Sequence, residues 1–236
     1  MEIYQKAVII NMISLAKALQ GFIDADRKNV KRYSLMLTGG RSAERLYLAW
    51  SNLQGFRELS TVDFYFSDER CVPKISLDSI SGMTFRTLFR SGIPNGCSVF
   101  DMVVDYSNPE AEALRYSELL PDAIDFLLLS VGEDGHIASL FPGSRAFSKG
   151  TTKVVAVDCP KKPRRRLTVT PSVIKSARNI FVLAIGNAKA EVYRLVQRGN
   201  YCAVVYPADL VKDATWILGA ENPEEFSFSF PMEGFK

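Results

Sequence analysis

The sequence predicts an α/β fold with one open, mainly parallel β-sheet flanked by helices, in a Rossmann-like arrangement. Short runs of apolar, β-branched and aromatic residues alternate with stretches of helical periodicity along the 236 residues, as is typical of such folds. Several runs contain almost no polar residue, as in Phe126–Leu129, and this composition indicates strands that are buried on both faces. No repeat or linker divides the chain, so we expect residues 1–236 to form a single domain.

The individual elements follow from the same pattern. Met1–Ile23 predicts an amphipathic helix rather than a secretory signal, because Lys17 interrupts its apolar part and it has no small-residue cleavage site. One stripe of this helix would contain Val8, Met12, Leu15 and Leu19. Strands are expected at Tyr33–Thr38, Val62–Ser67, Ser98–Val104, Asp125–Val131, Lys153–Asp158, Leu167–Thr170 and Asn179–Ile185. Further helices are expected at Arg41–Leu53, Asp78–Phe89, Pro109–Leu120 and Asn187–Gln197. The tail from Glu221, where phenylalanine and serine alternate, suits an edge strand or a packed arm.

Composition and charge narrow the class of protein. The net charge of +3 suits a small anionic ligand and does not require nucleic acid. The single histidine and the wide spacing of the cysteines argue against a zinc site or a redox pair. The four cysteines are Cys71, Cys97, Cys159 and Cys202. Their free thiols, and the lack of an apolar run long enough for a membrane helix, predict a cytoplasmic protein with no membrane partner.

Four predicted strands are each followed by a loop that carries glycine or charge. In open parallel sheets, ligands bind at the carboxyl ends of the strands, so we expect the chemistry in these loops. The loops are Thr38–Ser42, Asp68–Arg70, Gly132–His136 and Gly186–Lys189.

The first loop has the composition of an anion cradle. Gly39 and Gly40 let the backbone approach a ligand closely, and the helix expected just beyond them presents free N–H groups. Arg41 and Ser42 could add further donors. The alternative is an ordinary strand-to-helix turn, and the Gly-Lys-Ser/Thr signature of a Walker loop is missing.

The second loop places a carboxylate beside a guanidinium. If the extended conformation persists, Asp68 and Arg70 point to one side and Glu69 to the other. In a cleft, Asp68 and Arg70 could orient hydroxyls and bind an oxyanion, although a structural ion pair is the commoner use of such residues.

The third loop contains His136, the candidate general base. The ordinary pKa of histidine, about 6.5, suits proton transfer at neutral pH. Asp134, two residues earlier, could fix the tautomer of His136 or steer a water molecule. A metal site made of Glu133, Asp134 and His136 is the weaker alternative, because no second histidine or cysteine cluster supports it.

The run Lys161–Arg166 is strongly basic and raises the hypothesis of nucleic-acid binding. It lacks interleaved aromatic residues, so we expect most of its side chains to be solvated. Arg166 differs because it directly precedes a predicted strand, and it could bind phosphate through its planar guanidinium. Lys189, at the start of a predicted helix, could supply a second positive charge.

Taken together, these segments resemble the 6-phosphogluconolactonase family. The matching motifs occur in the right order over most of the chain, and the Asp-Gly-His loop that continues Ile-Ala-Ser-Leu-Phe-Pro is the most specific. They are Leu37–Gly40, Ser67–Pro73, Asp78–Ser79, Gly132–Gly143, Arg166–Thr170 and Gly186–Ala190.

The resemblance implies a sheet of the kind found in glucosamine-6-phosphate deaminases and ribose-5-phosphate isomerases. It also implies hydrolysis of 6-phosphoglucono-δ-lactone to 6-phosphogluconate in the oxidative pentose phosphate pathway, without a cofactor. We further expect no metal, and a monomer or homodimer. By position, His136 would activate water, Asp134 would orient it, and Asp68 would complete the catalytic set. Asp68 and Arg70 would line the sugar pocket. The phosphate would be surrounded by Gly40, Ser42, Arg166 and Lys189.

Two positions depart from the family pattern. Arg41–Ala43 stands where the family usually has Ser-Thr-Pro, and Ile80 stands where asparagine usually follows Asp-Ser. Arg41 could compensate with its charge, whereas Ile80 removes a polar side chain from near the cleft.

Three other functions fit the same sheet: a glucosamine-6-phosphate deaminase, a sugar-phosphate isomerase and a non-catalytic sugar-phosphate sensor. Ala138–Pro142 argues against the deaminase, in which the loop usually continues Ala-Phe-Asn-Glu-Pro. The presence of His136 argues against the sensor.

Overall fold

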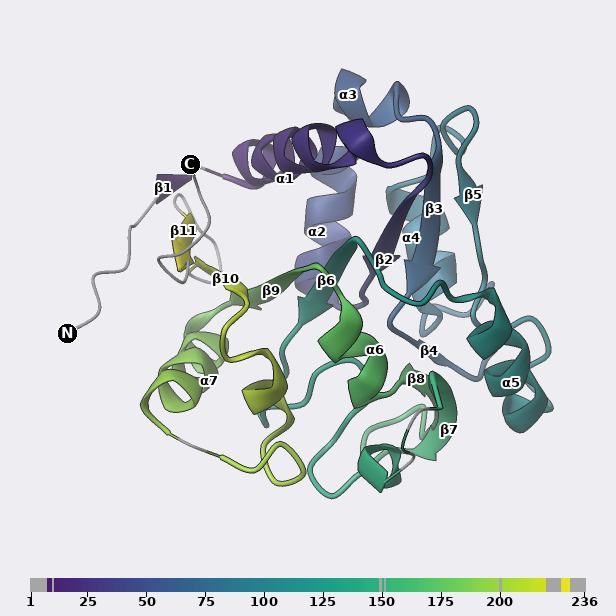
Figure 1. Ribbon diagram of the computed structural model, residues 1–236, viewed down its shortest axis with the longest axis vertical. Helices are drawn as coiled ribbons and strands as arrows, with labels where there is room; N and C mark the ends of the chain where they lie inside the picture. The colour runs from purple at the N-terminus through teal and green to yellow at the C-terminus, as the bar shows by residue number, and fades with distance from the viewer. Residues whose placement is uncertain are drawn as a thin grey trace.

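The computed structural model describes residues 8–9, 11–148, 150, 152–199, 201–219 and 226–229, and its centre is a mainly parallel sheet (Figure 1). Neighbouring strands of the sheet follow the order β1-β11-β10-β9-β6-β2-β3-β5. The six strands from β10 to β5 are parallel to one another. In chain order they are β2 (Tyr33–Leu37), β3 (Val62–Phe66), β5 (Ser98–Val99), β6 (Phe126–Ser130), β9 (Asn179–Ile185) and β10 (Thr215–Gly219). The predicted fold class is confirmed.

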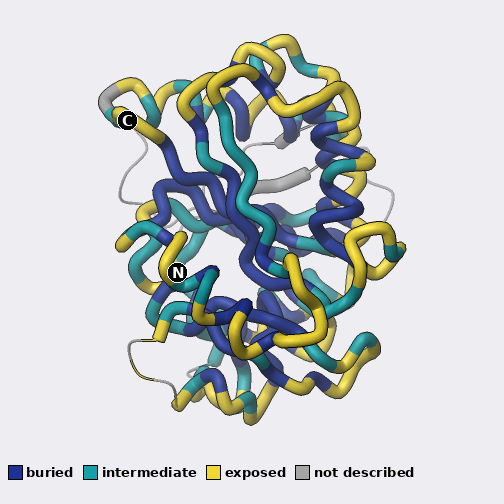
Figure 2. The backbone as a smooth tube through the Cα atoms, turned by 90° about the vertical axis from the view of Figure 1, so that its right-hand side faces the viewer, coloured by how far each residue is buried: buried dark blue, intermediate teal, exposed yellow. Residues whose placement is uncertain are grey.

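The central strands are apolar because both of their faces are covered. All five residues of β2 are buried, and so are four of the five in β6. Figure 2 shows these buried strands crossing the middle of the molecule, with exposed segments in the loops around them. Burial on both faces excludes water from the sheet and leaves only the strand ends available for polar chemistry.

Helices flank the sheet, and side chains at their first turns define where several of them begin. Asn11, Ser79 and Asn108 accept hydrogen bonds from backbone N–H groups at the starts of α1, α4 and α5. The helices are α1 (Met12–Asp26), α2 (Arg41–Trp50), α3 (Gln54–Arg57), α4 (Ile80–Thr87), α5 (Pro109–Leu119), α6 (Pro171–Ser176) and α7 (Asn187–Arg198). Within the described ranges, no helix is long and apolar enough to cross a bilayer.

A second, antiparallel sheet lies beside α5 (Figure 1). It contains β4 (Asp68–Arg70), β8 (Arg165–Val169) and β7 (Val154–Asp158), in that order. Two strands predicted for the parallel sheet, β7 and β8, therefore belong to a separate sheet. The connection between them is too short for the crossover that parallel strands need, and it forms a hairpin instead.

Two short antiparallel strands, one from the N-terminal part of the chain and one from the C-terminal part, pair at one side of the main sheet. Val8 lies in β1 (Val8–Ile9), which pairs with β11 (Phe226–Ser229), so the predicted N-terminal helix is wrong at residues 8–9, whereas residues 1–7 and 10 lie outside the described residues. The helix begins late because the side chain of Asn11 caps it. In the C-terminal tail β11 is a strand, whereas Glu221 lies outside the described residues.

Candidate active site

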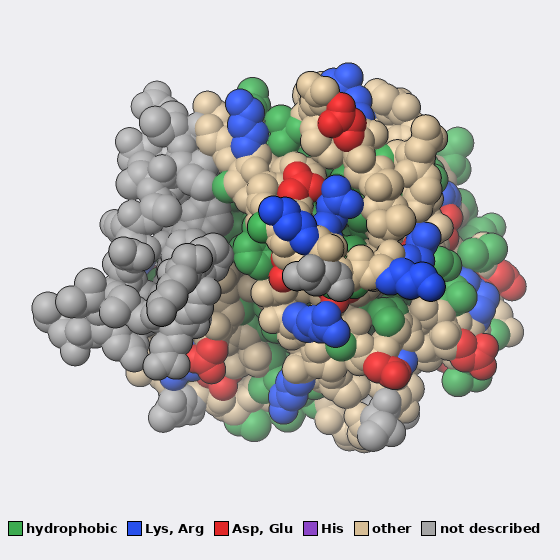
Figure 3. All heavy atoms as spheres, turned by 45° about the horizontal axis from the view of Figure 1, so that its top comes forward, with side chains coloured by type: hydrophobic (Ala, Val, Ile, Leu, Met, Phe, Trp, Pro, Cys, Tyr) green, Lys and Arg blue, Asp and Glu red, His purple; other side chains and the backbone are tan. Residues whose placement is uncertain are grey.

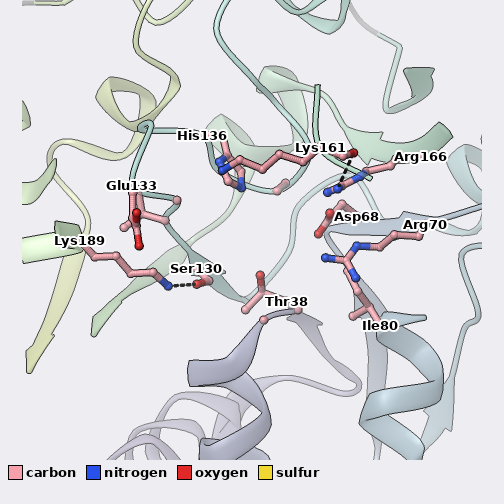
Figure 4. Close-up of a pocket in the computed structure, with 15 residues that line it drawn as sticks. Thr38, Asp68, Arg70, Ile80, Ser130, Glu133, His136, Lys161, Arg166 and Lys189 are labelled. Carbon is pink, nitrogen blue, oxygen red and sulfur yellow. Dashed lines mark hydrogen bonds between the residues drawn. The ribbon is translucent and has the colours of Figure 1, made fainter. Parts of the chain in front are cut away.

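A cleft of about 310 Å³ opens where β2, β4 and β6 end, and most of the predicted site residues line it (Figure 4). Those residues are Gly39, Gly40, Asp68, Arg70, His136, Arg166 and Lys189. Arg41 and Ser42 instead line an adjoining cavity of about 510 Å³, which shares Glu133 and Lys189 with the cleft. Asp134 does not line the cleft, but its carboxylate contacts Nδ1 of His136.

The loop after β6 fixes the imidazole of His136. The N–H of Gly132 donates to the carbonyl of His136 at 2.8 Å, and the N–H of Gly135 donates to the carbonyl of Gly132 at 3.0 Å, which closes a tight turn. Any Cβ at Gly132 would lie 2.0 Å from the Cε1 atom of His136. Only glycine therefore fits at position 132 while the ring keeps its place.

His136 and Asp134 form a hydrogen-bonded pair. Nδ1 of His136 contacts Oδ1 of Asp134, and the imidazole stacks on Phe141 with ring centroids 4.2 Å apart. Burial lowers the pKa of His136, although Asp134 partly opposes this effect. Burial would raise the pKa of Asp134, but His136 and Lys161 together lower it to about 2. A neutral imidazole that donates from Nδ1 leaves Nε2 free to accept a proton.

The short strand β4 separates Asp68 and Arg70 from Glu69, as the alternation predicted. Asp68 is buried, and its Oδ2 accepts a hydrogen bond from Oγ of Ser139 at 2.6 Å. Arg70 donates from Nη1 to the carbonyl of Asp78 at 2.6 Å rather than forming an ion pair within the described residues. Asp68 and Arg70 both face the cleft.

Glu69 points away from the cleft and ties β4 to α4. Its carboxylate accepts hydrogen bonds from the N–H groups of Ile80 at 2.8 Å and Ser81 at 2.6 Å, and from the hydroxyl of Ser79 at 3.1 Å. A carboxylate at a helix N-terminus is favourable because the free N–H groups and the helix dipole both attract negative charge. Glu69 thereby fixes the position of the cleft wall that Ile80 forms.

The glycine loop is held from below by Tyr47. The hydroxyl of Tyr47 accepts from the N–H of Thr38 at 3.0 Å and donates to its carbonyl at 2.8 Å. A Cβ at Gly39 would lie 2.7 Å from the side chain of Ile80, so the two chain segments touch there. Helix α2 starts just beyond, and no side chain caps its N-terminus. Its first N–H groups remain available for an anion.

Two of the residues predicted to bind phosphate, Lys189 and Arg166, face the cleft from opposite ends (Figure 4). Lys189 lies near Glu133 and donates from Nζ to Oγ of Ser130 at 3.3 Å, whereas Arg166 lies near Asp68 (Figure 4). Burial and the charge of Arg41 lower the pKa of Lys189. Within the described ranges, no group of three His, Cys, Asp or Glu side chains could hold a metal ion.

Sequence reasoning missed two residues that the structure places at the site. Ser139 accepts from Nη1 of Arg166 at 3.3 Å and donates to Asp68, but it lies in an apolar motif that gives no sign of this role. Lys161 was expected to be solvated with the rest of its basic run, yet it lines the cleft and forms an ion pair with Asp134 at 3.0 Å. On the face in Figure 3, basic side chains are interspersed with acidic and apolar ones.

Comparison with known proteins gives consistent matches. Residues 11–218 match the family described as glucosamine-6-phosphate isomerases/6-phosphogluconolactonase. A protein named 6-phosphogluconolactonase 3 from Saccharomyces cerevisiae is 33% identical over 174 residues, which cover 68% of this chain and 70% of that protein. The 6-phosphogluconolactonase of Mycobacterium tuberculosis is 32% identical over 234 residues, which cover 92% of this chain and 94% of the relative.

Solved structures share the fold. The 6-phosphogluconolactonase of Trypanosoma brucei superposes with a TM-score of 0.74 and 25% identity, covering 93% of this chain and 98% of that chain. A monomeric glucosamine-6-phosphate deaminase superposes with a TM-score of 0.71 but only 20% identity, covering 90% of this chain and 96% of that chain. At that identity the likeness extends to the fold alone.

Proposed function

The chain belongs to the family of glucosamine-6-phosphate isomerases and 6-phosphogluconolactonases, and we propose that it hydrolyses 6-phosphoglucono-δ-lactone to 6-phosphogluconate in the oxidative pentose phosphate pathway. The relatives at 32% and 33% identity are named 6-phosphogluconolactonases, and one of them aligns with 92% of the chain. The observation that carries the proposal is the His136–Asp134 pair at a cleft that also contains fixed cations.

In the proposed mechanism, water attacks the lactone carbonyl directly. Nε2 of His136 takes a proton from the water as its oxygen bonds to C1, which gives a tetrahedral oxyanion. The oxyanion collapses, the bond from C1 to the ring oxygen breaks, and the imidazolium returns the proton to the departing oxygen. Asp134 stabilises the transient imidazolium, and a base placed in this way contributes about 10²–10⁴-fold to the rate.

We place the sugar against β4 and the phosphate against α2. Asp68 can accept hydrogen bonds from sugar hydroxyls, and Arg70 can donate to them. The free N–H groups at the start of α2, together with Lys189 and Ser42, offer a site for the phosphate dianion. Each charge-assisted hydrogen bond there is worth about 1.5–3 kcal/mol. Because the phosphate is remote from C1, this energy holds the carbonyl beside the water.

Arg166 has a different part in this arrangement. Its guanidinium already donates to the carbonyls of Pro163 at 2.8 Å and Lys161 at 3.2 Å and to the hydroxyl of Ser139. We therefore assign Arg166 mainly to holding Ser139 and Asp68, whereas the sequence predicted that it binds phosphate. Both roles are open to test with the variants described below.

The proposal includes a small sugar phosphate as the substrate and a cytoplasmic location, without a nucleic-acid or membrane partner. The four cysteines are unpaired, which suits a reducing compartment.

A coupled assay tests the function. The purified protein is given fresh lactone, and 6-phosphogluconate is followed and corrected for uncatalysed ring opening. We expect strong hydrolysis by the wild type and almost none by His136→Ala. Release of ammonia from glucosamine 6-phosphate would support the deaminase instead. Tight lactone binding without turnover would support the sensor.

A further inference from the structure

The carboxylate of Asp134 has two partners, one on each oxygen. Oδ1 contacts Nδ1 of His136, and Oδ2 forms an ion pair with Nζ of Lys161 at 3.0 Å. Lys161 comes from the connection between β7 and β8, far from the His136 loop in the sequence. Asp134 therefore joins the base to a cation that belongs to the small sheet.

Buried contacts hold the connection that carries Lys161. The carbonyl of Lys161 accepts from Nη2 of Arg166 at 3.2 Å, which Figure 4 marks with a dashed line, and the carbonyl of Pro163 accepts from Nε at 2.8 Å. Arg166 is only 4% exposed, so it is a rigid anchor. The main chain of Lys161 thus has a fixed position, even though its side chain reaches the surface.

Lys161 also contacts the ring that supports His136. Its Nζ lies 5.6 Å from the centroid of Phe141, within the range of a cation–π contact, and His136 stacks on that same ring. Lys161 and His136 therefore share two neighbours, the carboxylate of Asp134 and the ring of Phe141.

We propose that Lys161 is a positioning residue, which orients Asp134 and keeps His136 neutral as the base of the lactonase site. The role of His136 as the base rests on the proposed function. Burial is the main cause that disfavours the imidazolium, Asp134 favours it, and Lys161 adds to the effect of burial because like charges repel. The charged groups that face His136 from the surrounding elements, or share its cleft, are Asp134, Lys161, Asp68, Arg70, Arg166, Glu133 and Lys189.

The imidazole can be observed directly, because His136 is the only histidine in the chain. In a protein without an added histidine tag, its NMR signals report one titration. In Lys161→Met we expect the midpoint to move to higher pH by roughly 0.5–1 pH unit, since a nearby positive charge has been removed. High salt should reduce the difference, because it screens the charge that remains in the wild type.

Two variants control for the loss of charge. Lys161→Arg keeps the cation, so its titration should match the wild type. Lys162→Met removes an exposed lysine from the same basic run, and it should leave the midpoint unchanged. The kinetics should change together with the titration midpoint. In Lys161→Met, the decline of kcat/KM at acidic pH should begin at a higher pH than in the wild type. We also expect kcat to fall several-fold, while KM changes little.

Equal titration midpoints in the wild type and Lys161→Met would overturn the proposal. Failure of the proposed function looks different, because the wild type would then show no lactone hydrolysis while the titration of His136 still reported on Lys161. A shifted midpoint that Lys161→Arg does not restore would also count against the proposal, since it would indicate general disruption of the loop.

Discussion

Burial gives His136 a chemistry that an exposed histidine would not have. The pKa of His136 is lowered because its charged form is poorly solvated, so the imidazole stays neutral to a lower pH than that of an exposed histidine. As the pH falls from 8, kcat/KM should therefore reach half of its plateau value only below about pH 6.5, the ordinary pKa of histidine. A pH–rate profile of the wild type, corrected for background hydrolysis, checks this. A profile that falls to half above about pH 6.5 would contradict it.

Gly132 should be intolerant of even one added carbon. The Cβ of Gly132→Ala would overlap the imidazole of His136, so we expect kcat to fall by about 10²–10⁴-fold, the contribution of a general base. KM should change little, because Gly132 lies beside His136, the general base, and not beside the proposed phosphate site. Gly21→Ala is the matched control: it has open space in α1, so it should keep full activity and gain stability.

Variants of Lys189 and Arg166 test which of these two residues binds the phosphate. In Lys189→Gln we expect KM to rise by about 10–100-fold, the loss of one charge-assisted hydrogen bond. In Arg166→Gln we expect mainly a lower kcat, because Ser139 and Asp68 lose their support. Steady-state kinetics of both variants, with the exposed Arg164→Gln as control, decide the matter. A larger rise in KM for Arg166→Gln would move the phosphate to the opposite end of the cleft.

At the scale of elements, Tyr47 of α2 supports the end of β2. In Tyr47→Phe the N–H and carbonyl of Thr38 lose their partner in a buried place, so the free energy of unfolding should fall by about 1–3 kcal/mol and KM should rise. Tyr33→Phe is a control at the opposite end of the same strand, where the hydroxyl contacts Asp26 at 2.7 Å. It should reduce stability without affecting KM, as urea titrations and kinetics can show.

The sequence predicted elements well where one local pattern decided them. The strands β2, β6 and β9 could be predicted because an apolar run by itself indicates a strand that is buried on both faces, without information from elsewhere in the chain. The pattern could not show that β7 and β8 leave the main sheet, because strand composition does not encode a partner. Their short spacing was the available signal.

The site residues divide in the same way. Glycines and charged residues that directly follow strands were found, since the carboxyl edge of a parallel sheet gathers them. Ser139 and Lys161 were missed because their roles depend on contacts with Asp68 and Asp134, which come from other segments of the chain.

At the scale of the whole molecule, the cleft depends on both sheets. Asp68 and Arg166 belong to the small sheet, whereas His136 follows β6 of the main sheet. The N–H of Val169 also donates to the carbonyl of Ser67 at 2.9 Å, at the point where the chain passes from one sheet to the other. Contacts of this kind support our proposal that residues 1–236 form a single domain.

Calorimetry should therefore show one unfolding transition, with calorimetric and van't Hoff enthalpies that agree. The product 6-phosphogluconate should raise the temperature of this one transition without splitting it, since the product binds only the folded state. Two separate transitions, of which only one responds to the product, would show that the sheets unfold independently.

The contact between Gly39 and Ile80 limits how the chain can vary. Ile80 occupies the space that any side chain at position 39 would need, and Glu69 fixes the backbone on which Ile80 sits. Bulk can be added at 39 only after bulk has been lost at 80. A smaller residue at position 80 should therefore be tolerated first, and a larger residue at position 39 only after it. In a library varied at both positions, active variants with a side chain at position 39 should also have a smaller residue at position 80.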